Sequence, residues 1–103
     1  MLIVIKRDGK RERFDREKLR GGLLKSCEKT TVSLDNINDI VDTIERKLRN
    51  EDTLEVESQK IGQIVATHLK KIDKIAYIRF ASVFKRFVDV EDFEKEVQRL
   101  IKN

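Results

Sequence analysis

The N-terminal residues change from an apolar run to a charged run across a turn signal, a pattern that predicts a β-hairpin. The apolar run 2–5 is followed by Lys6-Arg7, the turn signal Asp8-Gly9 and a charged return over 10–14. Asp-Gly between two strand-like runs is a strong hairpin signal, because both central residues of the tight turn need positive φ. A turn of two residues pairs 7 with 10, 6 with 11, 5 with 12, 4 with 13 and 3 with 14.

This register divides the hairpin into two faces, because cross-strand partners share a face. One face carries Ile3, Ile5 and Phe14, with Arg7, Lys10 and Glu12 towards the tip. The other face carries Leu2, Val4, Lys6, Arg11 and Arg13. It is an apolar floor beneath several cations, which suits a flat anionic ligand. Lys6 and Arg7 point to opposite faces, so both reach one ligand only if it wraps the strand end.

Apolar residues then recur at helical spacing through most of the chain. They predict helices over about 15–29, 33–49, 58–72 and 75–87, and a last one that begins near residue 90. The predicted N-caps are Asp15, Ser33 or Asp35, Ser58, Asp73, and Asp89 or Asp92. Leu54 and Val56 alternate with charged residues over 53–57, which predicts a third strand beside the hairpin, since two strands alone are marginal.

These elements predict an α+β fold. We expect a small three-stranded antiparallel sheet, made of the N-terminal hairpin and one short strand, packed on a bundle of four to five helices. At 103 residues the chain is long enough for one domain, which we expect to span 1–103. The fourth helix is apolar almost all round and is therefore expected to be central.

The net charge is small, but its position is informative. The chain carries +4 overall, and the window 6–20 holds eight Lys or Arg against four Asp or Glu. The rest of the chain is balanced, so the hairpin and the helix after it carry the whole surplus. A localised cationic surface indicates an anionic partner. The alternative is a solvated basic edge that limits strand aggregation.

Several kinds of chemistry lack the residues they need. Cys27 and His68 are the single cysteine and the single histidine, and they fall on different predicted helices, which argues against a metal site. No phosphate-binding glycine loop and no nucleophile signature occurs, so we predict no catalytic residue and no enzyme. No apolar run approaches the length of a membrane span, and one cysteine fits a reducing compartment, so we expect a cytoplasmic protein.

Three segments resemble the ATP-cone domain: VIKRDG over 4–9, FDREKL over 14–19 and AYIRFASVFKRF over 76–87. The resemblance runs from about residue 3 to residue 97. Together with Cys27-Glu28-Lys29 and Ile61-Gly62, it is most similar to the cone of the NrdR family of ribonucleotide reductase transcriptional regulators. That family places a four-cysteine zinc ribbon before the cone, whereas Met1 directly precedes it here. We therefore expect a free-standing cone or a shortened chain.

The resemblance implies that ATP or dATP, accompanied by Mg²⁺, binds between hairpin and helices as a regulatory signal. Val4 matches the position whose backbone meets the adenine. The positions that hold the phosphates match Lys6, Arg7 and Lys18. Tyr77 matches a tyrosine near the nucleotide, and Phe84 stands where NrdR proteins often have a second one. The chemistry agrees, because lysine offers a point charge and arginine a bidentate fork to phosphate oxygens.

We therefore expect a nucleotide-sensing module that changes its oligomeric state or partner contacts and is linked to control of ribonucleotide reductase expression or activity. Its expected partners are a second copy of itself, and ribonucleotide reductase or a zinc-ribbon DNA-binding part. One alternative is the basic nucleic-acid-binding part of a transcriptional repressor. Another is a regulatory domain detached from an enzyme such as ribonucleotide reductase.

Overall fold

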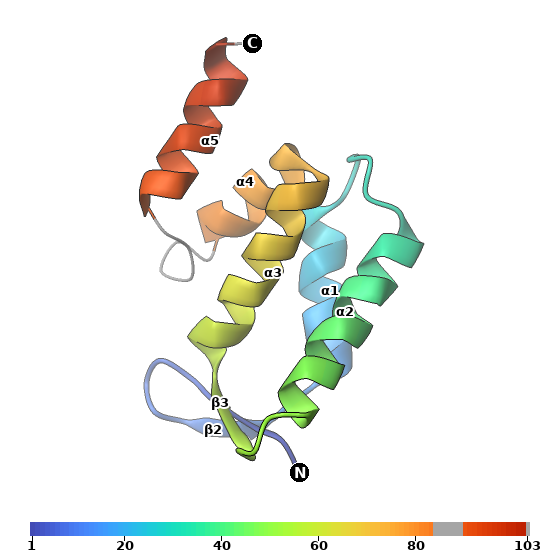
Figure 1. Cartoon of the computed structure of the whole chain (residues 1–103), viewed down its shortest axis with the longest axis vertical. Helices are drawn as coiled ribbons and strands as arrows, with labels where there is room; N and C mark the ends of the chain where they lie inside the picture. Colours follow the sequence, from blue (N-terminus) through green and yellow to red (C-terminus); the bar gives the residue numbers. More distant parts are fainter. Residues whose placement is uncertain (84–89, 103) are drawn as a thin grey trace.

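The computed structural model describes residues 1–83 and 90–102, except for the side chain of Asp92. A small sheet lies at one end of a group of four helices, and a fifth helix stands beside them (Figure 1). The elements are β1 (Ile3–Ile5), β2 (Arg11–Arg13), α1 (Arg16–Ser26), α2 (Leu34–Arg49), β3 (Glu55–Glu57), α3 (Ser58–Ile72), α4 (Lys74–Val83) and α5 (Val90–Lys102). The predicted α+β class is confirmed. None of the described helices is long and apolar enough to cross a membrane.

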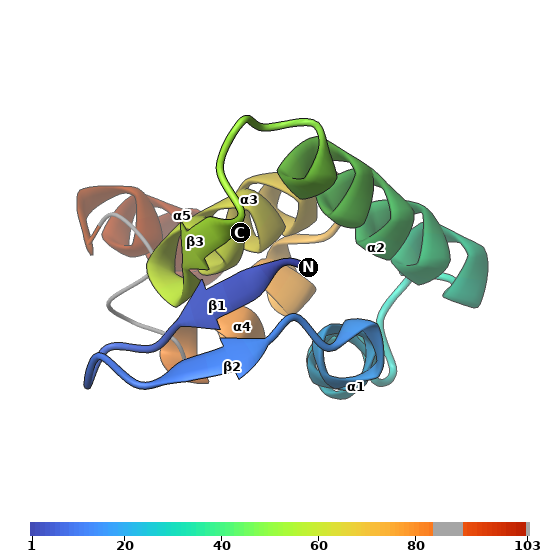
Figure 2. The ribbon, with the colours of Figure 1, turned by 90° about the horizontal axis from the view of Figure 1, so that it is seen from below.

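The sheet has the strand order β2-β1-β3, with β1 in the middle (Figure 2). β1 pairs with β2 antiparallel, as predicted, but it pairs with β3 parallel. The sheet is therefore mixed, and the prediction of a purely antiparallel sheet was wrong in this respect. Parallel strands need a long crossover connection, and the pair of helices α1 and α2 supplies it before the chain returns to the sheet.

The hairpin register differs by one residue from the predicted one. The observed partners are Ile3 with Arg13, Val4 with Glu12 and Ile5 with Arg11. The loop has three residues, 7–9: Lys6 N donates to Lys10 O at 2.8 Å, and Gly9 N donates to Lys6 O at 2.9 Å. Gly9 has a φ of 86°, the left-handed conformation that closes a three-residue hairpin loop.

A shift of one residue moves the second strand's side chains to the opposite faces. Glu12 now shares a face with Val4, whereas Arg11 and Arg13 share a face with Ile3 and Ile5. The predicted grouping of Val4 with Arg11 and Arg13 was therefore wrong. The cause is the length of the loop. A two-residue turn would consist of Asp8 and Gly9, whereas the observed loop has three residues, 7–9, and Gly9 is the last of them.

Three of the predicted helix caps are confirmed. The carboxylate of Asp15 accepts hydrogen bonds from the backbone N–H groups of residues 17 and 18 at the start of α1. Ser33 and Asn36 form a reciprocal capping box on α2. At α4, Asp73 Oδ1 accepts from Ala76 N at 3.0 Å. These side chains satisfy backbone donors that the first turn of a helix leaves without partners.

Two boundaries differ from the prediction. α1 ends at Ser26 rather than near residue 29, because Lys29 takes a φ of 56° and the chain turns. Ser58 does not cap α3: the N-cap is Glu57, which makes no side-chain capping hydrogen bond. The reason is that β3 ends at Glu57 and α3 begins at the next residue, so the strand enters the helix without a turn.

The core lies between the first four helices and the sheet. α4 contributes Ala76, Tyr77, Phe80 and Ala81 to it, which confirms the predicted central position of this helix. α5 is joined to α4 by a buried carboxylate, Glu96, whose Oε2 lies 3.0 Å from Lys74 Nζ. The predicted end of the fourth helix at Phe87, the cap Asp89 and the position of Phe84 lie outside the described residues, as does the side chain of Asp92.

Candidate functional site

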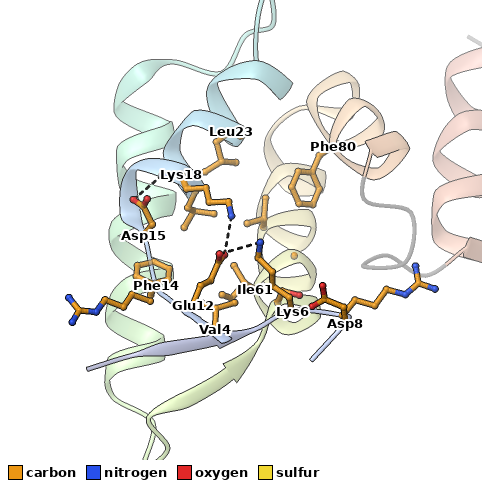
Figure 3. Close-up of a pocket in the computed structure, with 17 residues that line it drawn as sticks. Val4, Lys6, Asp8, Glu12, Phe14, Asp15, Lys18, Leu23, Ile61 and Phe80 are labelled. Atoms are coloured by element: carbon orange, nitrogen blue, oxygen red, sulfur yellow. Dashed lines mark hydrogen bonds and ion pairs between the residues drawn. The ribbon is translucent and has the colours of Figure 1, made fainter. Parts of the chain in front are cut away.

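A cavity of about 720 Å³ lies between the hairpin and the helices (Figure 3). This volume lies in the range of small-molecule sites, which is roughly 300–1,000 Å³. The hairpin and the residues up to α1 contribute Val4, Lys6, Arg7, Asp8, Glu12, Arg13, Phe14 and Asp15. The helices contribute Lys18, Leu19, Gly22, Leu23, Ser58, Ile61, Gly62, Val65 and Phe80.

The cavity has an apolar part and a charged part. The apolar part lies among the helices, where Leu23 of α1, Ile61 and Val65 of α3, and Phe80 of α4 line it. The charged part lies along the hairpin and the first turn of α1, where its cations are Lys6, Arg7 and Lys18. Arg13 also borders the cavity, but its side chain belongs to the opposite face of the sheet. Such a cavity suits a ligand with a flat apolar portion and an anionic portion.

Glu12 lies between two of these cations. Lys18 Nζ donates to Glu12 Oε1 at 2.9 Å, and Lys6 Nζ lies 3.2 Å from Glu12 Oε2, so the two ammonium groups converge on one carboxylate (Figure 3). The hydrogen bond from Lys18, and then the one from Lys6, lower the pKa of Glu12. The hydrogen bond between Lys18 and Glu12 also raises the pKa of Lys18. Two lysines held around one carboxylate form a site that can also accept the oxygens of an anionic ligand.

Local sequence explains how these groups come together. The three-residue loop places Glu12 opposite Val4, on the face of the sheet that lines the cavity. Asp15 fixes the start of α1 by accepting from Lys18 N at 3.2 Å, which holds Lys18 in the first turn. Side chains in that turn lean back towards the helix N-terminus, and here Lys18 reaches the hairpin.

Four of the five predicted site residues line this one cavity: Val4, Lys6, Arg7 and Lys18. The expected conflict between Lys6 and Arg7 does not arise, because Arg7 belongs to the loop rather than to a strand face. Tyr77 does not line the cavity. It is 2% exposed in the core, whereas Phe80, one turn later on the same helix, reaches the cavity wall. A direct contact between Tyr77 and a ligand stays a prediction.

The predicted site residues did not include Glu12, Gly22, Gly62 and Phe80, which also line the cavity. Glu12 would have been found from the correct register, whose signal is the glycine at the third loop position. Gly22 and Gly62 could have been noticed in the sequence, because glycine is unfavourable inside a helix and its presence there indicates a functional or packing role. Nothing in the local pattern distinguishes Phe80 from the other apolar residues of α4.

The remaining candidate side chains lie apart from the cavity. Cys27 is buried, and burial raises the pKa of its thiol. His68 is half-buried; burial, and then the positive charges of Lys71 and Lys47, lower its pKa. Within the described residues, no group of three or more His, Cys, Asp and Glu could hold a metal ion.

Comparison with known proteins gives consistent matches. The family model of the ATP cone domain matches residues 2–90. A transcriptional repressor NrdR of Desulforamulus reducens is 49% identical over 102 residues, which cover 99% of this chain and 65% of that protein. The NrdR repressor of Thermotoga neapolitana is 48% identical over 99 residues, which cover 96% of this chain and 64% of that protein. The chain thus spans slightly less than two thirds of the length of these relatives.

Proposed function

This chain belongs to the ATP-cone family, and from that premise we propose that its cavity is a regulatory binding site for ATP or dATP. The observation that carries the proposal is the pair of ammonium groups, Lys6 and Lys18, held around one carboxylate at the charged part of an otherwise apolar cavity. A nucleoside triphosphate has the matching chemistry, a flat base joined to several negative charges.

In this proposal Lys6, Arg7 and Lys18 hold the phosphates. Each hydrogen bond between a charged donor and a phosphate oxygen contributes about 1.5–3 kcal/mol. Glu12 must give up its two lysines when the triphosphate arrives, so the site exchanges one anion for another. Mg²⁺ would enter with the nucleotide and be held mainly by the phosphates, as is usual for this ion.

Val4 has a different place in this proposal from the one that the resemblance implies. β1 is the middle strand and Val4 is the partner of Glu12, so the backbone groups of Val4 are directed at β2. A backbone contact with adenine would compete with this ladder. We therefore assign to Val4 the floor of the cavity, where its side chain is one of the apolar lining groups.

Titration calorimetry with ATP, dATP and GTP tests the site. We expect ATP and dATP to bind and GTP to bind more weakly. Lys6→Ala and Arg7→Ala should each weaken triphosphate binding about tenfold or more, from the loss of a charged hydrogen bond. Both should leave adenosine binding nearly unchanged.

Lys10→Ala is the matched control, because Lys10 is a cation of the same hairpin that does not line the cavity. Its triphosphate affinity should equal that of the unmodified chain. Equal losses for adenosine and ATP in Lys6→Ala would contradict a phosphate role, and equal binding of ATP and GTP would contradict adenine selectivity.

Nucleotide occupancy would act by shifting the oligomeric state or the contact with a partner. A ligand shifts such an equilibrium only if it binds one state more tightly than the other. The relatives are named transcriptional repressors, and we propose that this chain reports nucleotide levels, in the cytoplasm, to the control of ribonucleotide reductase expression. The partner would be a second copy, a zinc-ribbon DNA-binding part or the reductase itself.

Direct nucleic-acid binding is the second candidate, because the relatives are named repressors. The structure gives it less support than the charge distribution of the sequence suggests. Arg11 pairs with Glu55, and Arg16 lies 2.5 Å from Asp42 and 3.1 Å from Glu45. A mobility-shift assay at two salt concentrations separates the candidates, since binding through phosphates weakens steeply with salt.

A further inference from the structure

The tandem glycines of α1, Gly21 and Gly22, are not in close contact with any other part of the described residues 1–83 and 90–102. A Cβ added at either position would meet no atom within 4 Å, and neither glycine has a positive φ. Glycine inside a helix costs about 1 kcal/mol relative to alanine. The helix therefore carries two unfavourable residues, for which neither backbone conformation nor close packing against the described part of the chain supplies a reason.

The two glycines differ in their surroundings. Gly22 lines the cavity and Gly21 does not. Gly22 lies one turn beyond Lys18 along α1, on the way from the charged part of the cavity to its apolar part. α3 also presents a glycine to the cavity, the buried Gly62. The lining thus includes a residue without a side chain from each of these two helices.

We propose that Gly22 is a specificity-determining residue, whose missing side chain leaves the space that the planar base of the bound nucleotide fills. This inference rests on the proposed function. If Lys6, Arg7 and Lys18 hold the phosphates, the base extends away from them into the apolar part, where α1 must offer a flat surface. A side chain at position 22 would project into that space, since Gly22 lines the cavity and its Cβ would meet no atom of the described residues within 4 Å.

The test compares Gly22→Ala and Gly22→Leu with Gly21→Ala by calorimetry with ATP and with inorganic tripolyphosphate. Overfilling a packed site costs about 1–3 kcal/mol, so Gly22→Ala should weaken ATP binding roughly five- to hundredfold. Gly22→Leu should weaken it further. Gly21→Ala is the matched control and should bind ATP as the unmodified chain does. Tripolyphosphate has no base, so its binding should be the same in all four proteins.

Thermal unfolding provides the second readout. Both alanine variants should unfold at the same or a higher temperature than the unmodified chain, because alanine favours the helix and meets no obstacle. A lower unfolding temperature for Gly22→Ala alone would reveal a packing role and overturn the proposal. Unchanged ATP binding by Gly22→Ala and Gly22→Leu would overturn it while leaving the proposed function intact. Failure of the unmodified chain to bind ATP would overturn both.

Discussion

Glu12 is the residue on which the charged part of the cavity depends. Its two oxygens are shared between Lys18 and Lys6, which come from different elements, so one carboxylate ties the hairpin to the first turn of α1. The pair is exposed to solvent, and exposed ion pairs contribute little stability. In the proposed function its importance is geometric, because it would hold two ammonium groups within reach of the same ligand oxygens before a ligand arrives.

We expect the carboxyl carbon of Glu12 to titrate below its ordinary pKa of 4.5 in an NMR experiment, because Lys18 and Lys6 stabilise the charged form. A lowered pKa means that Glu12 supports the fold fully above pH 4.5 and loses that support as the pH falls through the folded-state pKa. Lys18→Ala should return the pKa towards 4.5. Lys25→Ala, which removes a lysine of α1 that does not line the cavity, should leave it unchanged.

Asp73 and Glu96 also have lowered pKa values and titrate in the same acidic range. A pH profile of unfolding alone would therefore mix three carboxylates. Glu12→Gln isolates the contribution of Glu12, since it removes one titrating group and leaves the other two. Two results together would contradict the arrangement in which Glu12 bridges Lys6 and Lys18. They are an acid unfolding profile that is unchanged in Glu12→Gln, and a pKa of Glu12 in the unmodified chain that is not lowered.

At the scale of elements, Asp73 connects two parts of the chain that are distant in sequence. It caps α4 through Ala76 N, and its Oδ2 accepts from Thr31 Oγ1 at 2.7 Å and from Thr31 N at 3.2 Å. Burial raises the pKa of Asp73, but the hydrogen bonds from Ala76 and Thr31 outweigh it, so the pKa lies below its ordinary value. The loop between α1 and α2 is thereby fixed to the start of the central helix.

We expect Asp73→Ala to lower the free energy of unfolding by about 1–2 kcal/mol, since it removes the cap and leaves the Thr31 groups without their acceptor. Asp73→Asn should recover only part of this, because its single amide oxygen can accept from Ala76 N or from Thr31 but cannot replace both carboxylate oxygens. Urea unfolding measures the difference. Ser33→Ala removes the cap of α2 only, so its loss of free energy of unfolding shows how much a cap contributes without a second connection. Equal stability of Asp73→Ala and the unmodified chain would contradict the role of Asp73.

The caps of α1, α2 and α4 could be predicted because a cap depends on residues within one turn of it. The hairpin register could not be fixed in the same way. Asp8-Gly9 fits both a two-residue turn and a three-residue loop, and the difference of one residue decides whether Glu12 faces the cavity. The parallel orientation of β3 depends on how two helices carry the chain back to the sheet, which no local pattern reports.

At the scale of the whole molecule, part of the positive charge of residues 6–20 is paired with carboxylates from other elements. The carboxylates that pair with Arg11 and Arg16 come from β3 and α2, outside that window. A count along the chain cannot anticipate these pairs, because they join residues that are 26 to 44 positions apart. The family resemblance selected Lys6, Arg7 and Lys18 where the count could not, and all three line the cavity.

At this scale the exposed apolar residues of α4 and α5 are the notable surface. Val83 is 74% exposed and Ile101 is 71% exposed, and α5 contacts the rest of the described chain mainly through α4. We expect light scattering after size exclusion to show a larger assembly, or a changed distribution of assembly sizes, when ATP is added. Ile101→Ser should reduce the amount of the assembly.

Leu54→Ser is the matched control for that experiment, since Leu54 is equally apolar and 67% exposed but precedes β3 at the opposite end of the molecule. It should leave the assembly unchanged. Circular dichroism and thermal unfolding should show both variants folded as the unmodified chain is. A single monomeric peak with and without nucleotide would refute self-association.

The pairing of β1 with β3 also governs the order in which the protein can fold. Ile3 and Glu55 are partners in the sheet, so β1 can pair with β3 only after the chain between them, which includes α1 and α2, has been made. Contacts of such long range are formed slowly, because the loop entropy is lost before the contact is gained. During synthesis β1 can pair with β2 early, but its pairing with β3 must wait for residue 57. The cavity wall that contains Phe80 is synthesised later still. If the cavity binds nucleotide as proposed, the site is complete only in the finished domain and in none of its nascent fragments.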